Sequence, residues 1–186
     1  LVLPPEQTVL TIHDLGILRM RTGLRRWVLK RLLFDLPIKR LRYITVVSEA
    51  TKRDLIETTG CAEEKIVVIE NPVRAQFVCT EKKVFDPECP NVLHIGTAPN
   101  KNLINLIRAL SRIKCRLTII GQINPEAKTL LQENGLEYTN RSDLNDEQLH
   151  KEYSNADIVA FCSTFEGFGL PIIEAQAMQR PIITSD

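Results

Sequence analysis

The sequence predicts an α/β protein built from two units, each with a parallel sheet. Short β-branched apolar segments recur along the chain, and stretches with helical periodicity separate them. The 186 residues are 44% hydrophobic and 25% charged, which is enough apolar material for a core. This composition excludes a disordered tail, a collagen-like fibre and a disulfide-rich miniprotein.

Seven segments are predicted to be buried parallel strands because each is short and β-branched. They are residues 8–12, 43–47, 66–69, 92–95, 116–120, 157–161 and 181–184. Six stretches with helical spacing or helix end signals lie between them, and Pro171 suits the first turn of the last one. They are residues 19–34, the stretch from Ser48 to Gly60, and residues 101–112, 125–134, 146–155 and 170–178.

A domain boundary is predicted in the polar, proline-containing stretch 71–91, which has little periodicity. Charge also changes there, because residues 1–75 carry 13 basic and 9 acidic side chains whereas residues 76–186 carry 11 and 14. We therefore predict one unit over 1–72 and another over 73–186. The chain begins with Leu1 and stops after a predicted strand, so we expect it to be a piece of a larger protein.

Charge and cysteine content restrict the partners and the compartment. The net charge of +1 gives no overall field for nucleic acid, and no apolar run is long enough to cross a bilayer. The odd number of cysteines and the absence of a C-x-x-C pair argue against a disulfide framework and a zinc site. This cysteine usage makes a reducing cytoplasm the expected location. No signal peptide is recognisable at the start of the sequence. The cysteines are Cys61, Cys79, Cys89, Cys115 and Cys162.

The strongest candidate for a binding site is the segment from Glu166 to Glu174, which follows a predicted strand and opens a helix. Gly167 and Gly169 allow a ligand to approach the backbone, and a helix N-terminus favours a phosphate. Two carboxylates eight residues apart could hold sugar and ribose hydroxyls. Helix capping by Glu166 and a first-turn acid at Glu174 explain the same spacing.

Several segments, in order along nearly the whole chain, resemble the retaining glycosyltransferases of family 4. The residues from Phe165 to Ala175 resemble the E-x7-E motif of that family, and the segment from His94 to Leu103 resembles its phosphate loop. The other matching segments are residues 45–55, 65–73, 119–121 and 153–159.

The resemblance implies the GT-B fold, which has two Rossmann-like domains with parallel sheets, both incomplete in this chain. Residues 1–72 would then belong to the acceptor-side domain and residues 73–186 to the donor-binding domain. Members transfer a sugar from a nucleotide-sugar to an acceptor with retention of configuration, generally without a metal. The nucleotide-sugar is a substrate, so no cofactor is expected.

The resemblance also assigns roles to residues of the E-x7-E segment. Glu166 is expected to bind hydroxyls of the donor sugar as a catalytic residue, and Glu174 to bind the ribose. Gly167, Phe168, Gly169 and Leu170 are expected to line the donor pocket.

The phosphate loop supplies Gly96 and Lys101 to the predicted donor site. Without a metal, cations and helix N-termini must stabilise the departing diphosphate, and Lys101 is predicted to open a helix there. Many family members carry an arginine where this chain has Thr97 and a basic residue where it has Asn100. One cation is therefore missing or supplied from elsewhere.

His13 follows the first predicted strand, where the family places a histidine close to the donor sugar. We predict a catalytic positioning role for it, in which its carbonyl group stabilises charge at the anomeric carbon; a hydrogen-bonded loop histidine is the simpler alternative. A metal-binding pair of His13 and Asp14 would need further histidine ligands, and only His94 and His150 exist. No metal ligands are therefore predicted.

Gly121 and the segment 140–144 are expected at the same donor site. In the family, the position of Gly121 lines the donor cleft, and the loop at 140–144 lies where the nucleobase rests. Base contacts there often come from the backbone, so the sequence does not indicate which base is bound.

The basic stretch 16–42 contains nine basic residues and one acid, with Leu24, Trp27 and Leu32 interleaved. A cationic amphipathic helix in 19–42 could lie on anionic lipid, which fits a lipid-linked glycan acceptor at the inner membrane face. The same pattern also fits a solvated helix packed on its own sheet, with Trp27 and the leucines in the core.

Two other functions remain open. A nucleotide-sugar epimerase shares the GT-B architecture, although the E-x7-E segment favours transfer. A non-catalytic nucleotide-binding module is consistent with Thr97 and Asn100. We expect this chain alone to have little or no transferase activity.

Overall fold

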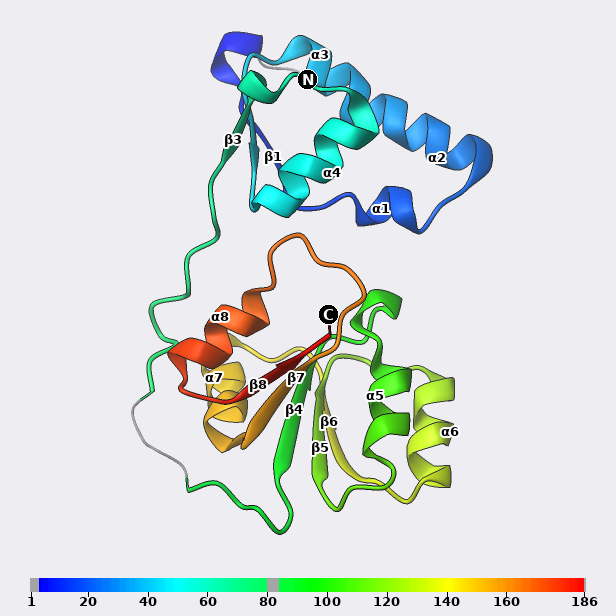
Figure 1. The fold of residues 1–186 in the computed structure, drawn as a ribbon, viewed down its shortest axis with the longest axis vertical. Coiled ribbons are helices and arrows are strands. Elements are labelled where there is room, and N and C mark those ends of the chain that lie inside the picture. Colours follow the sequence, from blue (N-terminus) through cyan, green and yellow to red (C-terminus); the bar gives the residue numbers. More distant parts are fainter. Residues whose placement is uncertain (1–3, 80–83, 186) are drawn as a thin grey trace. The chain divides into compact units, whose positions relative to one another are not determined.

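The computed structural model describes residues 4–79 and 84–185, which form two units (Figure 1). The first unit comprises Leu1–Pro72 together with the tripeptide Glu166–Phe168. The second comprises Val73–Phe165 and Gly169–Asp186.

The first unit contains a three-stranded parallel sheet in the order β1-β2-β3. Its strands are β1 (Leu10–Ile12), β2 (Ile44–Val46) and β3 (Ile66–Val68). All three predicted strands are confirmed. Their side chains form one core with Phe34, Ile38 and Leu55 from the helices.

The predicted helix over 19–34 is only partly correct. The structure has α1 (Gly16–Arg19), α2 (Gly23–Lys30), a π-helical segment Arg31–Asp35 and α3 (Leu36–Arg40). Gly23 has a φ of +60° and redirects the chain between α1 and α2. Pro37 lies in the first turn of α3, where its missing N–H costs least, so the helical run continues to Arg40.

Helix α4 (Glu49–Thr59) begins and ends where the sequence predicts. The Ser48 Oγ atom accepts a hydrogen bond of 3.0 Å from the Thr51 amide, which satisfies a free donor of the first turn. Gly60 ends the helix with a φ of +69°.

The second unit contains a five-stranded parallel sheet in the order β6-β5-β4-β7-β8. Four of its strands were predicted, and β6 was not. Strand β6 has the sequence Glu-Tyr-Thr-Asn-Arg and mostly exposed side chains, because it lies at the sheet edge and pairs only with β5. Its polar sequence carries no apolar signal. The strands are β4 (Asn91–Ile95), β5 (Arg116–Ile120), β6 (Glu137–Arg141), β7 (Ile158–Phe161) and β8 (Ile182–Thr184).

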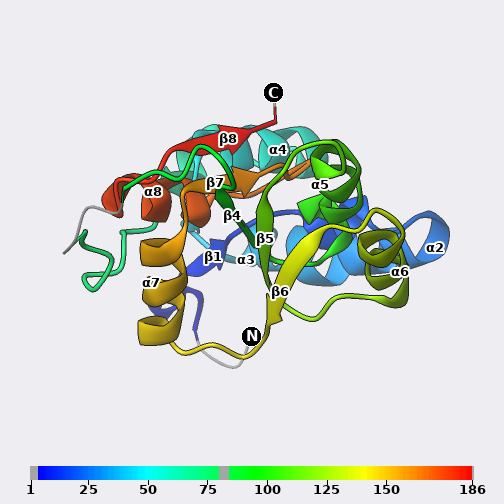
Figure 2. The same cartoon turned by 90° about the horizontal axis from the view of Figure 1, so that it is seen from below.

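Helices cover both faces of this sheet, with α5 and α6 on one face and α7 and α8 on the other (Figure 2). The helices are α5 (Leu103–Leu110), α6 (Pro125–Glu133), α7 (Asp146–Asn155) and α8 (Leu170–Ala177). The predicted start of α5 at residue 101 is wrong. Residues Pro99–Lys101 form a separate 3₁₀ turn, and Asn102, with a φ of +61°, precedes α5.

None of the helices in the described ranges is both long enough and apolar enough to cross a membrane.

Candidate functional site

The order of the strands indicates where the second unit can bind a ligand. From β4 the chain proceeds to β5 and β6 on one side of the sheet, and then returns to β7 and β8 on the other side. Ligands of open α/β sheets bind outside the carboxyl ends of the strands at such a reversal. The loop after β4 holds Gly96 and Lys101, and the loop after β7 leads to Gly169 and Leu170. The structure therefore brings these predicted residues to neighbouring strand ends.

Gly96 and Lys101 form a close contact. Gly96 has a φ of +93°, and a Cβ atom added to it would lie 2.9 Å from the Cγ and Cε atoms of Lys101. The lysine side chain thus crosses the glycine, and its Nζ atom lies 5.6 Å from the centre of the Phe161 ring. A larger residue at position 96 would displace Lys101, so glycine permits the path that the lysine takes.

Asn100 links the loop after β4 to the loop after β7. Its Nδ2 atom donates a hydrogen bond of 3.2 Å to the carbonyl oxygen of Phe165, and its own carbonyl oxygen accepts one of 2.8 Å from the Thr164 amide. Where family members often carry a cation, this chain has an amide that joins the loop after β4 to the loop after β7.

Gly121 lies against Thr97. Its φ is +124°, and an added Cβ atom would lie 3.1 Å from both Thr97 Cγ2 and Thr97 Oγ1. Asn140 is in β6 and not in the predicted loop 140–144, and its Nδ2 atom donates to the carbonyl oxygens of Ile119 (3.1 Å) and Gly121 (2.7 Å). Sequence reasoning missed this anchoring role because it placed Asn140 outside the sheet.

Gly169 begins helix α8 with a φ of +91°, and its missing Cβ atom leaves room for Ile172. The helix has Pro171 in its first turn, as predicted. The amino end of α8 carries the positive end of the helix dipole, which attracts an anion.

Glu174 is deeply buried on α8. Its side chain accepts a hydrogen bond of 2.7 Å at Oε2 from the Tyr153 hydroxyl, and its Oε1 atom lies 3.8 Å from Arg74 Nε. The residue is only 3% exposed. Burial is the main cause that raises the pKa of Tyr153, and the charge of Glu174 raises it further. Tyr153 therefore stays a neutral donor to the carboxylate at any physiological pH.

Arg74 connects the segment before β4 to this carboxylate. Its guanidinium pairs with Asp146 at the start of α7, and it lies over the Phe77 ring at 5.7 Å. Phe77 is buried and makes an edge-to-face contact with Tyr153 at 5.3 Å. Sequence reasoning assigned no role to Arg74 or Phe77, because the stretch 71–91 lacks periodicity.

His13 and Gly167 are brought together in the first unit. A Cβ atom added to Gly167 would lie 1.8 Å from the carbonyl oxygen of His13, so only glycine fits there. The Gly167 carbonyl oxygen accepts hydrogen bonds from Ser48 Oγ (2.5 Å) and Thr51 Oγ1 (3.0 Å). The sequence predicts Ser48 as a helix cap, and this second contact was not predicted.

The other two histidines take part in contacts of the second unit. His94 is buried in β4, its Nδ1 atom lies 3.1 Å from the carbonyl oxygen of Ala160, and burial lowers its pKa. His150 Nε2 lies 3.2 Å from the carbonyl oxygen of Val78. Across residues 4–79 and 84–185, no group of three or more His, Cys, Asp and Glu side chains could hold a metal ion.

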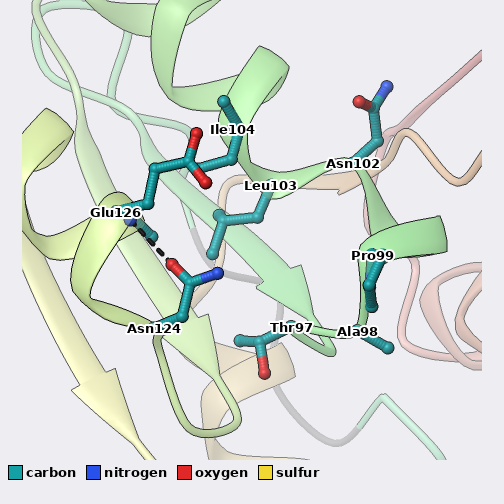
Figure 3. A pocket seen from close by; sticks show the side chains of 9 residues that line it. Thr97, Ala98, Pro99, Asn102, Leu103, Ile104, Asn124 and Glu126 are labelled. Atoms are coloured by element: carbon teal, nitrogen blue, oxygen red, sulfur yellow. Dashed lines mark hydrogen bonds between the residues drawn. The ribbon is translucent and has the colours of Figure 1, made fainter.

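A cavity of about 280 Å³ lies beside the loop after β4 (Figure 3). Asn124 and Glu126 come from the amino end of α6, and the Asn124 Oδ1 atom accepts from the Ala127 amide at 2.8 Å. Thr97 also lines the cavity, whereas Gly96 and Lys101 do not. The cavity therefore lies next to the predicted donor residues and not on them.

These features define a protein of the GT-B fold class, with two units whose described sheets are wholly parallel. Residues 89–186 match the family model described as "Glycosyl transferases group 1", and residues 4–77 match that described as "Glycosyltransferase Family 4". The chain belongs to the group 1 family of glycosyltransferases, because that match covers more than half of it. The resemblance predicted from the motifs is confirmed.

Two curated relatives are mannosyltransferases. The O-antigen chain mannosyltransferase RfbU of Salmonella typhimurium is 28% identical over 190 residues, which covers 97% of this chain and 52% of the relative. The MMP alpha-(1->4)-mannosyltransferase of Mycolicibacterium hassiacum is 27% identical over 156 residues, covering 76% of this chain and 36% of the relative. The chain therefore spans about half the length, or less, of these curated relatives.

A solved structure with the same fold is Anabaena Alr3699/HepE in complex with UDP and glucose. It has a TM-score of 0.78 and 21% sequence identity, and the match covers 95% of this chain and 52% of that one.

Proposed function

We propose that the protein transfers a hexose from a nucleoside diphosphate sugar to a glycan acceptor, with retention of anomeric configuration. The observation that carries the proposal is the pairing of the Gly96–Lys101 loop with the loop after β7 at the strand reversal. The two curated mannosyltransferases support a mannosyl donor. The complex of Alr3699/HepE with UDP supports a nucleoside diphosphate leaving group.

Catalysis by these residues would be electrostatic and positional. We propose that Lys101 and the amino end of α8 hold the diphosphate and stabilise the charge that grows on it as the sugar departs. No metal is needed in this scheme. Gly121 and Leu170 line the donor pocket of the second unit. Three roles expected from the family resemblance stay predictions: sugar binding for Glu166, pocket lining for Phe168 and sugar positioning for His13.

For Glu174 we propose the ribose contact, through its Oε1 atom. Tyr153 holds Oε2, whereas Oε1 lies 3.8 Å from Arg74 Nε. Because the carboxylate is almost fully buried, a ribose hydroxyl reaches it only when a neighbouring side chain moves aside.

The donor proposal is tested by ligand-observed NMR of the chain with UDP, GDP and ADP and their sugar conjugates. One nucleotide should bind, and Lys101→Gln should weaken it about tenfold through loss of a charge-assisted contact. Lys128→Gln, which removes an exposed lysine on α6, should leave binding unchanged. Absence of binding by all three nucleotides, in the complete protein as well as in this chain, would contradict the proposal.

A turnover assay with and without acceptor then separates transfer from epimerisation. Conversion of the donor sugar without acceptor would favour the epimerase. Nucleotide binding without any turnover by the complete protein would favour a binding module.

We also propose that helix α2 and the residues after it contact an anionic membrane surface, where a lipid-linked acceptor would be reached. Leu24, Trp27 and Leu32 are 74%, 63% and 56% exposed, so they lie outside the core of the described chain. Lys30 and Arg31 flank them in sequence. Apolar side chains among cations match the boundary of an anionic lipid layer.

The membrane contact is tested with Trp27, the single tryptophan of the chain. Its emission should shift to the blue with phosphatidylglycerol vesicles and not with phosphatidylcholine vesicles. Leu24→Asp should abolish the shift, whereas Ile113→Asp, at an exposed apolar position of the second unit, should not. No shift in the unsubstituted chain would refute the contact.

A further inference from the structure

A basic cavity lies in the first unit, at the opposite end of the sheet from His13. Its volume is about 300 Å³. It is formed where α3 leads toward β2 and where the loop Gly60–Lys65 leads into β3, both at the amino ends of the strands. His13, in contrast, follows the carboxyl end of β1.

Four cations and one carboxylate line this basic cavity: Lys30, Arg31, Lys39, Lys65 and Asp35. The neighbouring Glu63 pairs with Lys52 at 2.8 Å. The lining therefore carries an excess of three positive charges. Like charges around one cavity repel each other, and a bound anion removes that cost.

Two of the cations are held in place by their own partners. Lys30 Nζ binds both oxygens of Asp35, at 2.8 and 3.0 Å, over a spacing of five residues that matches the π-helical segment. Lys65 Nζ donates to the carbonyl oxygen of Ile38 at 2.8 Å, near the carboxyl end of α3. These contacts fix the lysines at the rim of the cavity.

The other two cations have no such partner. Across the described parts of the chain, neither Arg31 nor Lys39 forms an ion pair, and both side chains are exposed. An arginine beside lysines is a typical combination for a phosphate, because the guanidinium binds two oxygens in one plane.

From this arrangement we infer that the basic cavity binds a phosphate group. The cavity is at the small end of ligand sites, which span about 300–1,000 Å³, so it fits a single headgroup-sized anion. The phosphate can belong to a lipid headgroup or to a soluble phosphate. This site is separate from the proposed donor site and does not depend on sugar transfer.

The test uses the chain in a phosphate-free buffer, titrated with inorganic phosphate and followed by amide NMR. Signals of residues around the basic cavity should shift. Arg31→Gln combined with Lys39→Gln should weaken binding about tenfold or more. The matched control is Arg53→Gln, which removes an exposed cation of the same unit outside the cavity.

A second arm identifies the source of the phosphate, using vesicles of phosphatidylcholine with and without phosphatidic acid. Loss of phosphatidic acid binding in the double variant, together with competition by inorganic phosphate, would assign the site to a lipid headgroup. Phosphate binding with unchanged vesicle binding would assign it to a soluble phosphate.

Two results would overturn the inference. One is no shift at the basic cavity in the unsubstituted chain, with vesicle binding unaffected by the double variant. The other is an equal loss of phosphate binding in Arg53→Gln, which indicates general surface charge. Lys39→Gln alone serves as a second variant if the amide spectrum of the double variant shows unfolding.

Discussion

Replacing Tyr153 by phenylalanine is expected to destabilise the second unit by about 1.5–3 kcal/mol at neutral pH. The substitution keeps the ring and its contact with Phe77 but removes the donor to Glu174 Oε2, which is 2.7 Å away. The carboxylate is 3% exposed, so water cannot readily replace the lost hydroxyl. Hydrogen bonds to charged groups contribute about 1.5–3 kcal/mol, and that is the expected loss.

The difference in stability between the two proteins should also depend on pH, with a definite sign. The pKa of Tyr153 in the folded chain lies above its ordinary value of 10.0, because of burial first and the charge of Glu174 second. The unfolded chain therefore loses this proton at a lower pH than the folded chain does. The contribution of Tyr153 to the free energy of unfolding is fully present below pH 10. It falls by about 1.4 kcal/mol for each pH unit above that value.

Urea unfolding followed by far-ultraviolet circular dichroism, at pH 7 and pH 11, measures both effects. The difference in free energy of unfolding between the unsubstituted chain and Tyr153→Phe should be about 1.4 kcal/mol smaller at pH 11 than at pH 7, because phenylalanine has no proton to lose. Tyr43→Phe is the control at a half-exposed tyrosine, and Trp27 emission reports the first unit. The reasoning is refuted if the difference is the same at both pH values or is absent at pH 7.

Three further substitutions test the second unit by urea unfolding. Gly96→Ala should cost more than about 1 kcal/mol, because its φ is +93° and Lys101 occupies the space; Gly135→Ala, with a φ of +59° and open space, should cost less. Asn140→Ala should cost about 0.5–1.5 kcal/mol, because Asn140 is exposed and water can partly replace the lost donor; an equal stability would contradict this. Arg74→Gln should cost at most about 1 kcal/mol, because its pair with Asp146 is exposed; a larger loss would show that Arg74 stabilises Glu174 directly.

The strands of this protein were predictable to different degrees for a physical reason. Buried parallel strands must be apolar on both faces, so β2 and β5 are visible as β-branched runs. Strand β6 is an edge strand with exposed side chains, and its polar sequence resembles a loop. Helix ends with a local signal, such as Ser48 and Gly60 around α4, were also predictable.

The π-helical segment was not predictable, because Phe34 and Ile38, which both lie in the core of the first unit, have the spacing of an ordinary α-helix. The spacing of apolar residues predicts a helix but not a change in its pitch. The basic cavity depends on the same segment, so its cations appeared in the sequence only as a charged stretch.

The surroundings of the candidate site were less predictable than its residues. Short motifs identified Gly96, Lys101 and Glu174, because glycine conformation and helix starts leave local signals. The partners of Glu174 leave no such local signal in the sequence. Tyr153 contacts Glu174 from α7, and Arg74 contacts it from a segment without periodicity. Only the structure shows that the Glu174 carboxylate is already held by Tyr153.

The two acids of the E-x7-E segment therefore differ physically although they look alike in the sequence. Glu174 is the fifth residue of α8, about 7 Å along the helix from Gly169, and faces Tyr153 in the core. Glu166 is half-buried in the loop before that helix and is grouped with the first unit. The hydrogen bond from a neutral tyrosine holds the carboxylate in one orientation before any ligand arrives. This preorganisation suits the proposed ribose contact, because the donor then does not bear the cost of ordering Glu174.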